Sequence, residues 1–139
     1  MNSETKGILR GLASLAGDSH IGDYLSSPDF ARFCRDYDIC DEWDKYLVLS
    51  RDNPALYGDS VLVHAFVLFL EHLHHHMPER FLFLTSRLLF DFSRGLSCDL
   101  PVDEIRSSFL RLGYPPEKVD PALFALRIKQ VPDTEATEA

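Results

Sequence analysis

The apolar stretch at residues 60–96 constrains the fold more than any other part of the sequence, and a histidine cluster with a proline interrupts it near its middle. Between residues 61 and 70 only His64 is not apolar. Because strands are usually about 5–6 residues long, this pattern is too long for one buried strand. The run is also shorter than the ~20 apolar residues that span a membrane. We therefore predict two buried helices, at residues 60–76 and 79–94, that form a central antiparallel hairpin.

The residues at the ends of this hairpin carry helix start and stop signals. Pro78 disfavours helical geometry at the residue before it and suits the first turn of a new helix, and Glu79 complements the positive end of that helix. Asp59 and Ser60 have the short side-chain oxygens that cap a helix N-terminus. Gly95 occupies the place of a left-handed C-cap. We expect these residues to set the limits of the two helices.

Helical spacing of apolar residues continues on both sides of the hairpin. Before it, Ser3 can cap a first helix, the segment Ser27-Pro28-Asp29 is a strong helix start, and Asp41 can cap a further helix. After it, Gly113 stops one helix, and the segments 115–116 and 120–121 open two more. We predict an all-α fold, a compact single-domain bundle of about seven helices at residues 1–131. The polar, acidic residues 132–139 are predicted to be a disordered tail.

Charge and cysteine content exclude several classes of function. The net charge of −8 argues against a groove that follows nucleic-acid phosphates. The N-terminal region has an early Glu4 and no apolar core of the length that a secretory signal needs. Three cysteines without CxxC spacing fit free thiols in a reducing cytosol. We therefore expect a cytoplasmic protein with no nucleic-acid partner, no membrane association and no cofactor.

The histidine cluster at residues 72–76 has two interpretations. Glu71 and His74 form an ExxH pair, and His72, His75 and His76 lie close together on a helix because spacings of three and four share a face. The four residues Glu71, His72, His75 and His76 are the candidate metal ligands. The alternative, which we favour, is a solvated helix end, because imidazolium groups are stabilised by the negative C-terminus of a helix.

The second candidate site is the acidic and aromatic stretch at residues 36–44. Its spacing does not fit a calcium loop, since Cys40 stands at a ligand position and the required glycine is absent. The stretch is either a solvated helix start or a negative patch that docks a basic partner, with aromatic anchors. The candidate partner-binding residues are Asp36, Tyr37, Asp38, Asp41, Glu42, Trp43 and Asp44. If Trp43 instead faces the hairpin, the patch loses its main anchor.

These observations predict a binding protein and not an enzyme. The sequence has no glycine-rich phosphate loop, no recognisable pair of catalytic acids and no basic stripe. We expect a small acidic cytosolic protein that acts by binding another protein with a basic surface, as an adaptor, a regulator or an inhibitor such as an immunity or anti-defence protein. The alternative is a metal-binding helical enzyme or sensor that uses the cluster at His72–His76.

Overall fold

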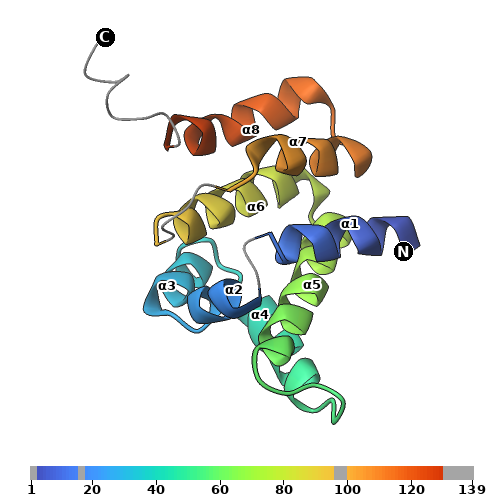
Figure 1. Ribbon diagram of the computed structural model, residues 1–139, viewed down its shortest axis with the longest axis vertical. Coiled ribbons are helices and arrows are strands. Elements are labelled where there is room, and N and C mark those ends of the chain that lie inside the picture. The colour runs from blue at the N-terminus through green and yellow to red at the C-terminus, as the bar shows by residue number, and fades with distance from the viewer. Residues whose placement is uncertain (1–2, 16–17, 96–99, 130–139) are drawn as a thin grey trace.

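The computed structural model describes residues 3–15, 18–95 and 100–129, and in these ranges the protein is entirely helical, without strands. Figure 1 shows the arrangement of the helices. Their bounds are α1 Ser3–Ala13, α2 Asp18–Leu25, α3 Pro28–Asp36, α4 Cys40–Arg51, α5 Asp59–His76, α6 Pro78–Ser93, α7 Val102–Arg111 and α8 Pro116–Lys129. The predicted all-α class is confirmed. The predicted tail at residues 132–139 lies outside the described residues, and no described helix is long and apolar enough to cross a membrane.

Both predicted central helices form, as α5 and α6, with fully buried side chains such as Phe69 and Leu70 on α5 and Phe81 and Leu84 on α6. Only one non-helical residue, Met77, joins the two helices. Antiparallel helices are usually joined by 2–5 residues. A connection of one residue is shorter than this, so the two helices meet at a corner. Figure 1 shows α6 crossing away from the end of α5, which corrects the antiparallel pairing that we expected. The helix that α5 contacts most extensively is α4.

The helix starts follow the sequence signals in part. The hydroxyl of Ser27 accepts a hydrogen bond from the backbone N–H of Phe30 at 3.3 Å, which confirms the predicted cap of α3. By contrast, α5 starts after Gly58, whose φ is +61°, and has no side-chain cap. The hydroxyl of Ser60 hydrogen-bonds the backbone of Tyr57 instead. Asp41 is likewise not a cap, because it lies one residue inside α4.

The two glycines expected to end helices differ. Gly113 has a φ of +104° and directly follows the C-cap of α7, so the prediction for this glycine is confirmed. Gly95 does not adopt a left-handed conformation, and α6 ends instead with Arg94 in helical geometry. The expectation for Gly95 was therefore wrong. The backbone N–H of Gly95 instead donates to the carbonyl of Phe92 at 3.2 Å. Such a bond to the third residue before can end a helix without a left-handed residue.

The C-terminal helix α8 is one continuous helix, where the sequence predicted a break at residues 120–121. Pro121 lies inside it and removes one backbone donor, which in a helix interior costs about 3 kcal/mol. Val119, Leu123 and Leu126 are buried on its inner face, and α8 packs on α6 and α7. Tertiary packing therefore overrides the local signal of the proline.

Candidate functional site

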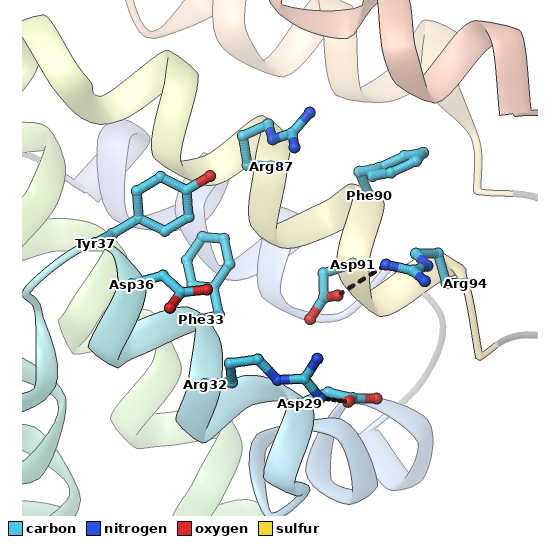
Figure 2. A pocket seen from close by; sticks show the side chains of 9 residues that line it. All are labelled: Asp29, Arg32, Phe33, Asp36, Tyr37, Arg87, Phe90, Asp91 and Arg94. Carbon is cyan, nitrogen blue, oxygen red and sulfur yellow. Dashed lines mark hydrogen bonds and ion pairs between the residues drawn. The ribbon is translucent and has the colours of Figure 1, made fainter.

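A groove between α3 and α6 brings together charged and aromatic side chains from both helices (Figure 2). Its volume is about 180 Å³. Two adjoining recesses extend it past Asp29 and Asp91 towards Tyr24 on α2. The lining combines three aspartates, three arginines and three aromatic residues: Asp29, Asp36, Asp91, Arg32, Arg87, Arg94, Phe33, Tyr37 and Phe90.

Both walls of the groove are built by the same helical spacing. On α3 the lining residues run from Asp29 to Asp36 at positions i, i+3, i+4 and i+7, and on α6 they run from Arg87 to Arg94 at the same intervals. Residues at these intervals share one face of a helix. Each helix therefore presents a straight stripe, and Figure 2 shows the two stripes facing each other across the groove.

Most of the charges in the groove already have partners. Arg32 pairs with Asp29 at 2.7 Å, and Arg94 lies 3.9 Å from Asp91. The phenol of Tyr24 donates a hydrogen bond of 2.7 Å to Asp91. Burial, followed by this hydrogen bond, raises the pKa of Tyr24 well above its ordinary value, so the phenol keeps its proton. Asp91 is thus fixed as part of the structure of the groove.

Arg87 and Asp36 are the charged groups of the lining that remain free for a ligand. Within the described ranges neither side chain forms an ion pair or a side-chain hydrogen bond. The guanidinium of Arg87 lies over the ring of Phe90, 5.7 Å from its centre. An arginine held on an aromatic face keeps its donors in a plane that suits a carboxylate or a carbonyl.

An aromatic ridge borders the groove where α3 ends. The ring of Tyr37 contacts Phe33 at 4.7 Å and Phe83 at 5.7 Å, measured between ring centres. Tyr37 is half-buried, whereas 52% of the surface of Phe83 is exposed. The guanidinium of Arg80 donates to the backbone carbonyl of Tyr37 at 3.2 Å and ties the ridge to α6. The ridge therefore offers a fixed apolar contact beside the free charges.

Asp38 stands in the turn after α3 with a φ of +56°, the one non-glycine residue at positive φ in the described part of the chain. The backbone N–H of Ile39 bonds the carbonyl of Cys34 at 2.9 Å, and that of Asp38 bonds Arg35 at 3.3 Å. These paired bonds are those of a left-handed C-cap, a place that glycine usually occupies. The turn exposes the carboxylate of Asp38 next to Tyr37.

The structure divides the predicted partner-binding stretch into a surface part and a core part. Asp36 and Tyr37 line the groove, and Asp38, Asp41 and Asp44 are exposed, while Glu42 is half-buried. Trp43, however, is only 7% exposed. Its ring makes edge contacts with Phe30 at 4.9 Å and Phe69 at 5.7 Å. The expectation that Trp43 anchors a partner is therefore corrected, because this ring belongs to the core.

Phe83 was missed by the sequence analysis, although a signal for it exists. It lies within the apolar run at residues 81–84 of α6, and its neighbours on both sides are buried. Arg80 and Arg87 stand three residues before and four residues after Phe83, which places all three on one face. A phenylalanine on the polar face of a helix indicates an exposed aromatic contact.

The histidine cluster forms hydrogen bonds that connect the corner between α5 and α6 to neighbouring segments. The Nδ1 atom of His72 lies 2.8 Å from the hydroxyl of Tyr46 on α4, and that of His74 lies 2.7 Å from the hydroxyl of Tyr114. Burial lowers the pKa of both histidines below 6.5, and a neighbouring histidine lowers it further. His75 is exposed and takes no part in these bonds.

The four candidate metal ligands line one shallow recess, but they are not arranged to hold a metal ion. In residues 3–15, 18–95 and 100–129 no group of three or more His, Cys, Asp or Glu side chains has the arrangement that a metal ion requires. The rings of His72 and His76 lie 4.7 Å apart, but the ring of His72 is already engaged with Tyr46. Glu71 is half-buried, and with Leu68 and Tyr46 it lines a shallow recess beside these rings.

Two potential nucleophiles, Cys34 and Ser50, are buried in the core. Burial raises the pKa of the Cys34 thiol to about 12, so this cysteine is not a reactive thiolate. Ser50 is fully buried, and its hydroxyl lies 2.9 Å from Nδ1 of His64. The single polar side chain of the run at residues 61–70 therefore has a hydrogen-bond partner inside the molecule. A serine without access to solvent cannot attack a substrate.

Comparison with known proteins gives no relative. No family model matches the chain, and neither a curated protein nor a solved structure matches it. The geometry of the residues themselves is therefore the basis for assigning a function.

Proposed function

We propose that the protein acts by binding another protein, and that its docking surface is the end of the α3–α6 groove together with the turn after α3. The docking surface consists of Asp36, Tyr37, Asp38, Phe83 and Arg87. The observation that carries this proposal is the exposed ring of Phe83, which is fixed against Tyr37 one helical turn from Arg87. Exposed tyrosine, phenylalanine and arginine are enriched in protein interfaces, and arginine and tyrosine are also enriched among the residues that dominate binding energy.

The charge around the docking surface favours a partner with a basic face. Asp36 and Asp38 lie in the surface, and Asp41 and Asp44 are exposed on the first turns of the adjoining α4. Within the described part of the chain none of these four carboxylates forms an ion pair. Unpaired acids on a protein with a net charge of −8 would attract a basic partner and speed its association.

Arg87 adds selectivity to this attraction. A partner that is uniformly basic would place a positive charge against this guanidinium, which costs binding energy. The preferred partner therefore has basic groups around a site that accepts an apolar ring and offers a carbonyl or carboxylate to Arg87. This requirement distinguishes one folded partner from basic proteins in general.

A binding role also agrees with the condition of the reactive groups. Cys34 is buried and protonated, and Ser50 is buried, so the groups near the centre of the molecule support packing. Cys34 and Cys40 are free thiols, which fits a cytoplasmic location. We assign the protein to the adaptors, regulators or inhibitors, and an immunity or anti-defence inhibitor is one form of this class.

The experiment compares two exposed phenylalanines. Partners are crosslinked to the wild-type chain in its source cells, identified, purified and titrated against Phe83→Ser and Phe124→Ser. Phe124 is 63% exposed on α8, away from the groove, and serves as the matched control. We expect Phe83→Ser to weaken binding by about 30-fold, equivalent to ~2 kcal/mol, with Phe124→Ser unchanged. Equal binding by the wild type and Phe83→Ser, with a loss in Phe124→Ser, would refute this docking surface.

A further inference from the structure

A second groove, between α1 and α5, is larger than the α3–α6 groove and shares no residue with it. Its volume is about 310 Å³. Lys6 and Arg10 line it from α1, while Val63, His64 and Val67 line it from α5. Small-molecule sites are typically apolar hollows of about 300 Å³ or more with a few polar groups at fixed positions. The groove therefore has the size and the kind of lining of a ligand site.

The wall formed by α5 is apolar. Val63 and Val67 stand one helical turn apart, and Leu68 extends the same strip. Val67 is buried, while Val63 and Leu68 remain half-buried at the surface of the groove. Apolar surface that stays in contact with water favours an alkyl chain as the occupant, because covering it releases about 25 cal/mol per Å².

The wall formed by α1 is cationic. Lys6 and Arg10 are exposed and one turn apart, and within the described residues neither forms an ion pair or a side-chain hydrogen bond. By contrast, Glu4, which is also on α1, lies 3.8 Å from Arg111 of α7. In a protein with a net charge of −8, two adjacent cations without carboxylate partners indicate an anionic ligand.

His64 adds a positioned polar group to the apolar wall. Its Nδ1 atom is held at 2.9 Å by the hydroxyl of Ser50, so the ring orientation is fixed and Nε2 is its remaining polar atom. Glu71 is the one carboxylate of the described lining. It stands seven residues from His64, which corresponds to ~10 Å along the helix axis. The carboxylate of Glu71 is therefore set apart from His64 along the α5 wall.

We infer that the α1–α5 groove binds a small amphipathic anion, namely a carboxylate on a short alkyl chain. The carboxylate pairs with Lys6 and Arg10, and the chain lies along Val63, Val67 and Leu68. At ~30 Å³ for a water-sized group, the volume holds a ligand of about ten non-hydrogen atoms. Octanoate has this size and both chemical features. The inference is independent of the proposed docking surface.

The test is a calorimetric titration of the full chain with octanoate, with octan-1-ol and acetate as partial probes. We expect octanoate to bind with a Kd below about 1 mM, and each partial probe to bind at least about tenfold more weakly. The double variant Lys6→Gln with Arg10→Gln should weaken octanoate binding at least about tenfold. Glu71→Gln should strengthen octanoate binding, because it removes the negative charge from the lining.

The matched control removes the same charge elsewhere. Lys118 and Arg51 are exposed and outside the groove, so Lys118→Gln with Arg51→Gln should bind octanoate as the wild type does. Thermal unfolding of each variant checks that the fold is kept. Equal binding of octanol and octanoate, an unchanged Kd in the Lys6 and Arg10 variant, or no saturation by about 10 mM octanoate would overturn the inference.

Discussion

The turns that follow α3 and α7 have the same hydrogen bonds and different residues at the critical position. After α7 the N–H groups of Gly113 and Tyr114 bond the carbonyls of Leu110 and Phe109 at 3.0 and 3.2 Å. The turn after α3 has the two equivalent hydrogen bonds, and Asp38 stands in the place of Gly113. A left-handed conformation costs a residue with a Cβ roughly 1–2 kcal/mol, and it costs glycine almost nothing.

This difference separates a structural turn from one at the candidate site. The ring of Tyr114 stacks on Phe81, at 5.3 Å between centres, and its hydroxyl bonds His74, so the α7 turn is packed into the molecule. Asp38 is exposed and belongs to the proposed docking surface. Backbone strain is found preferentially at functional sites. We interpret Asp38 as a residue kept for its charge, at a cost in stability that Gly113 avoids.

The largest expected effect is on the free energy of unfolding, and it distinguishes Trp43 in the core from Phe83 at the surface. Trp43→Ala should lower the free energy of unfolding by about 3–5 kcal/mol, because the ring fills a buried site between Phe30 and Phe69. Phe83→Ala should change it by less than about 1 kcal/mol, because half of this ring is already in water. Urea denaturation measures both. A small loss for Trp43→Ala would return Trp43 to the list of candidate anchors.

The next effect tests whether the α7 turn requires glycine. Gly113→Ala should cost about 1–2 kcal/mol, because alanine must adopt the left-handed conformation. The control is Gly7→Ala in the exposed middle of α1, where a Cβ would meet nothing within 4 Å. That substitution should stabilise the protein by up to about 1 kcal/mol, since alanine is the better helix former. If both changes have the same sign, the turn does not impose the conformation on which the comparison depends.

A smaller effect links the α7 turn to pH through the histidine corner. Burial lowers the pKa of His72 and His74 in the folded protein below 6.5, so the unfolded chain binds protons more readily. Their contribution to stability is fully present above pH 6.5 and is lost as the pH falls through their folded pKa values. We expect the melting temperature to fall between pH 7.5 and pH 5.5.

Replacement of single histidines identifies the source of this pH dependence. His74→Gln should reduce the slope of melting temperature against pH, because the group that resists protonation is removed. His20→Gln is the control, since His20 is exposed on α2 and bonds neither tyrosine of the corner. A slope that is the same in the wild type and in both variants would mean that the corner histidines do not couple to folding.

Apolar spacing alone predicted most of the helices, whereas the site depends on contacts between distant segments. The run at residues 61–70 and the cap at Ser27 are local signals, and the structure agrees with both. The stripes of α3 and α6 are also visible in the sequence as helical spacing. No local sequence pattern, however, indicates that the two stripes face each other. Pro121 was misread because packing of α8 outweighs a local cost.

The exposure of the residues at the predicted site could be foreseen only in part, for a related reason. The acidic stretch indicated a polar surface at the end of α3, but the burial of Trp43 depends on Phe69, which stands 26 residues further along. The left-handed conformation of Asp38 was equally hidden, because aspartate tolerates it without requiring it. Sequence patterns therefore located the turn but did not show which of its residues face the solvent.

The measurement that tests the account most directly compares Asp38→Gly with Asp38→Asn, in both stability and partner association. Asp38→Gly relieves the turn and should raise the free energy of unfolding by about 0.5–1 kcal/mol. Asparagine tolerates the left-handed conformation about as well as aspartate, so Asp38→Asn should leave stability nearly unchanged. Both variants lose the charge, and both should associate more slowly with the crosslinked partner, most clearly at low salt. A glycine variant that gains no stability, or two variants that associate as fast as the wild type, would contradict the account.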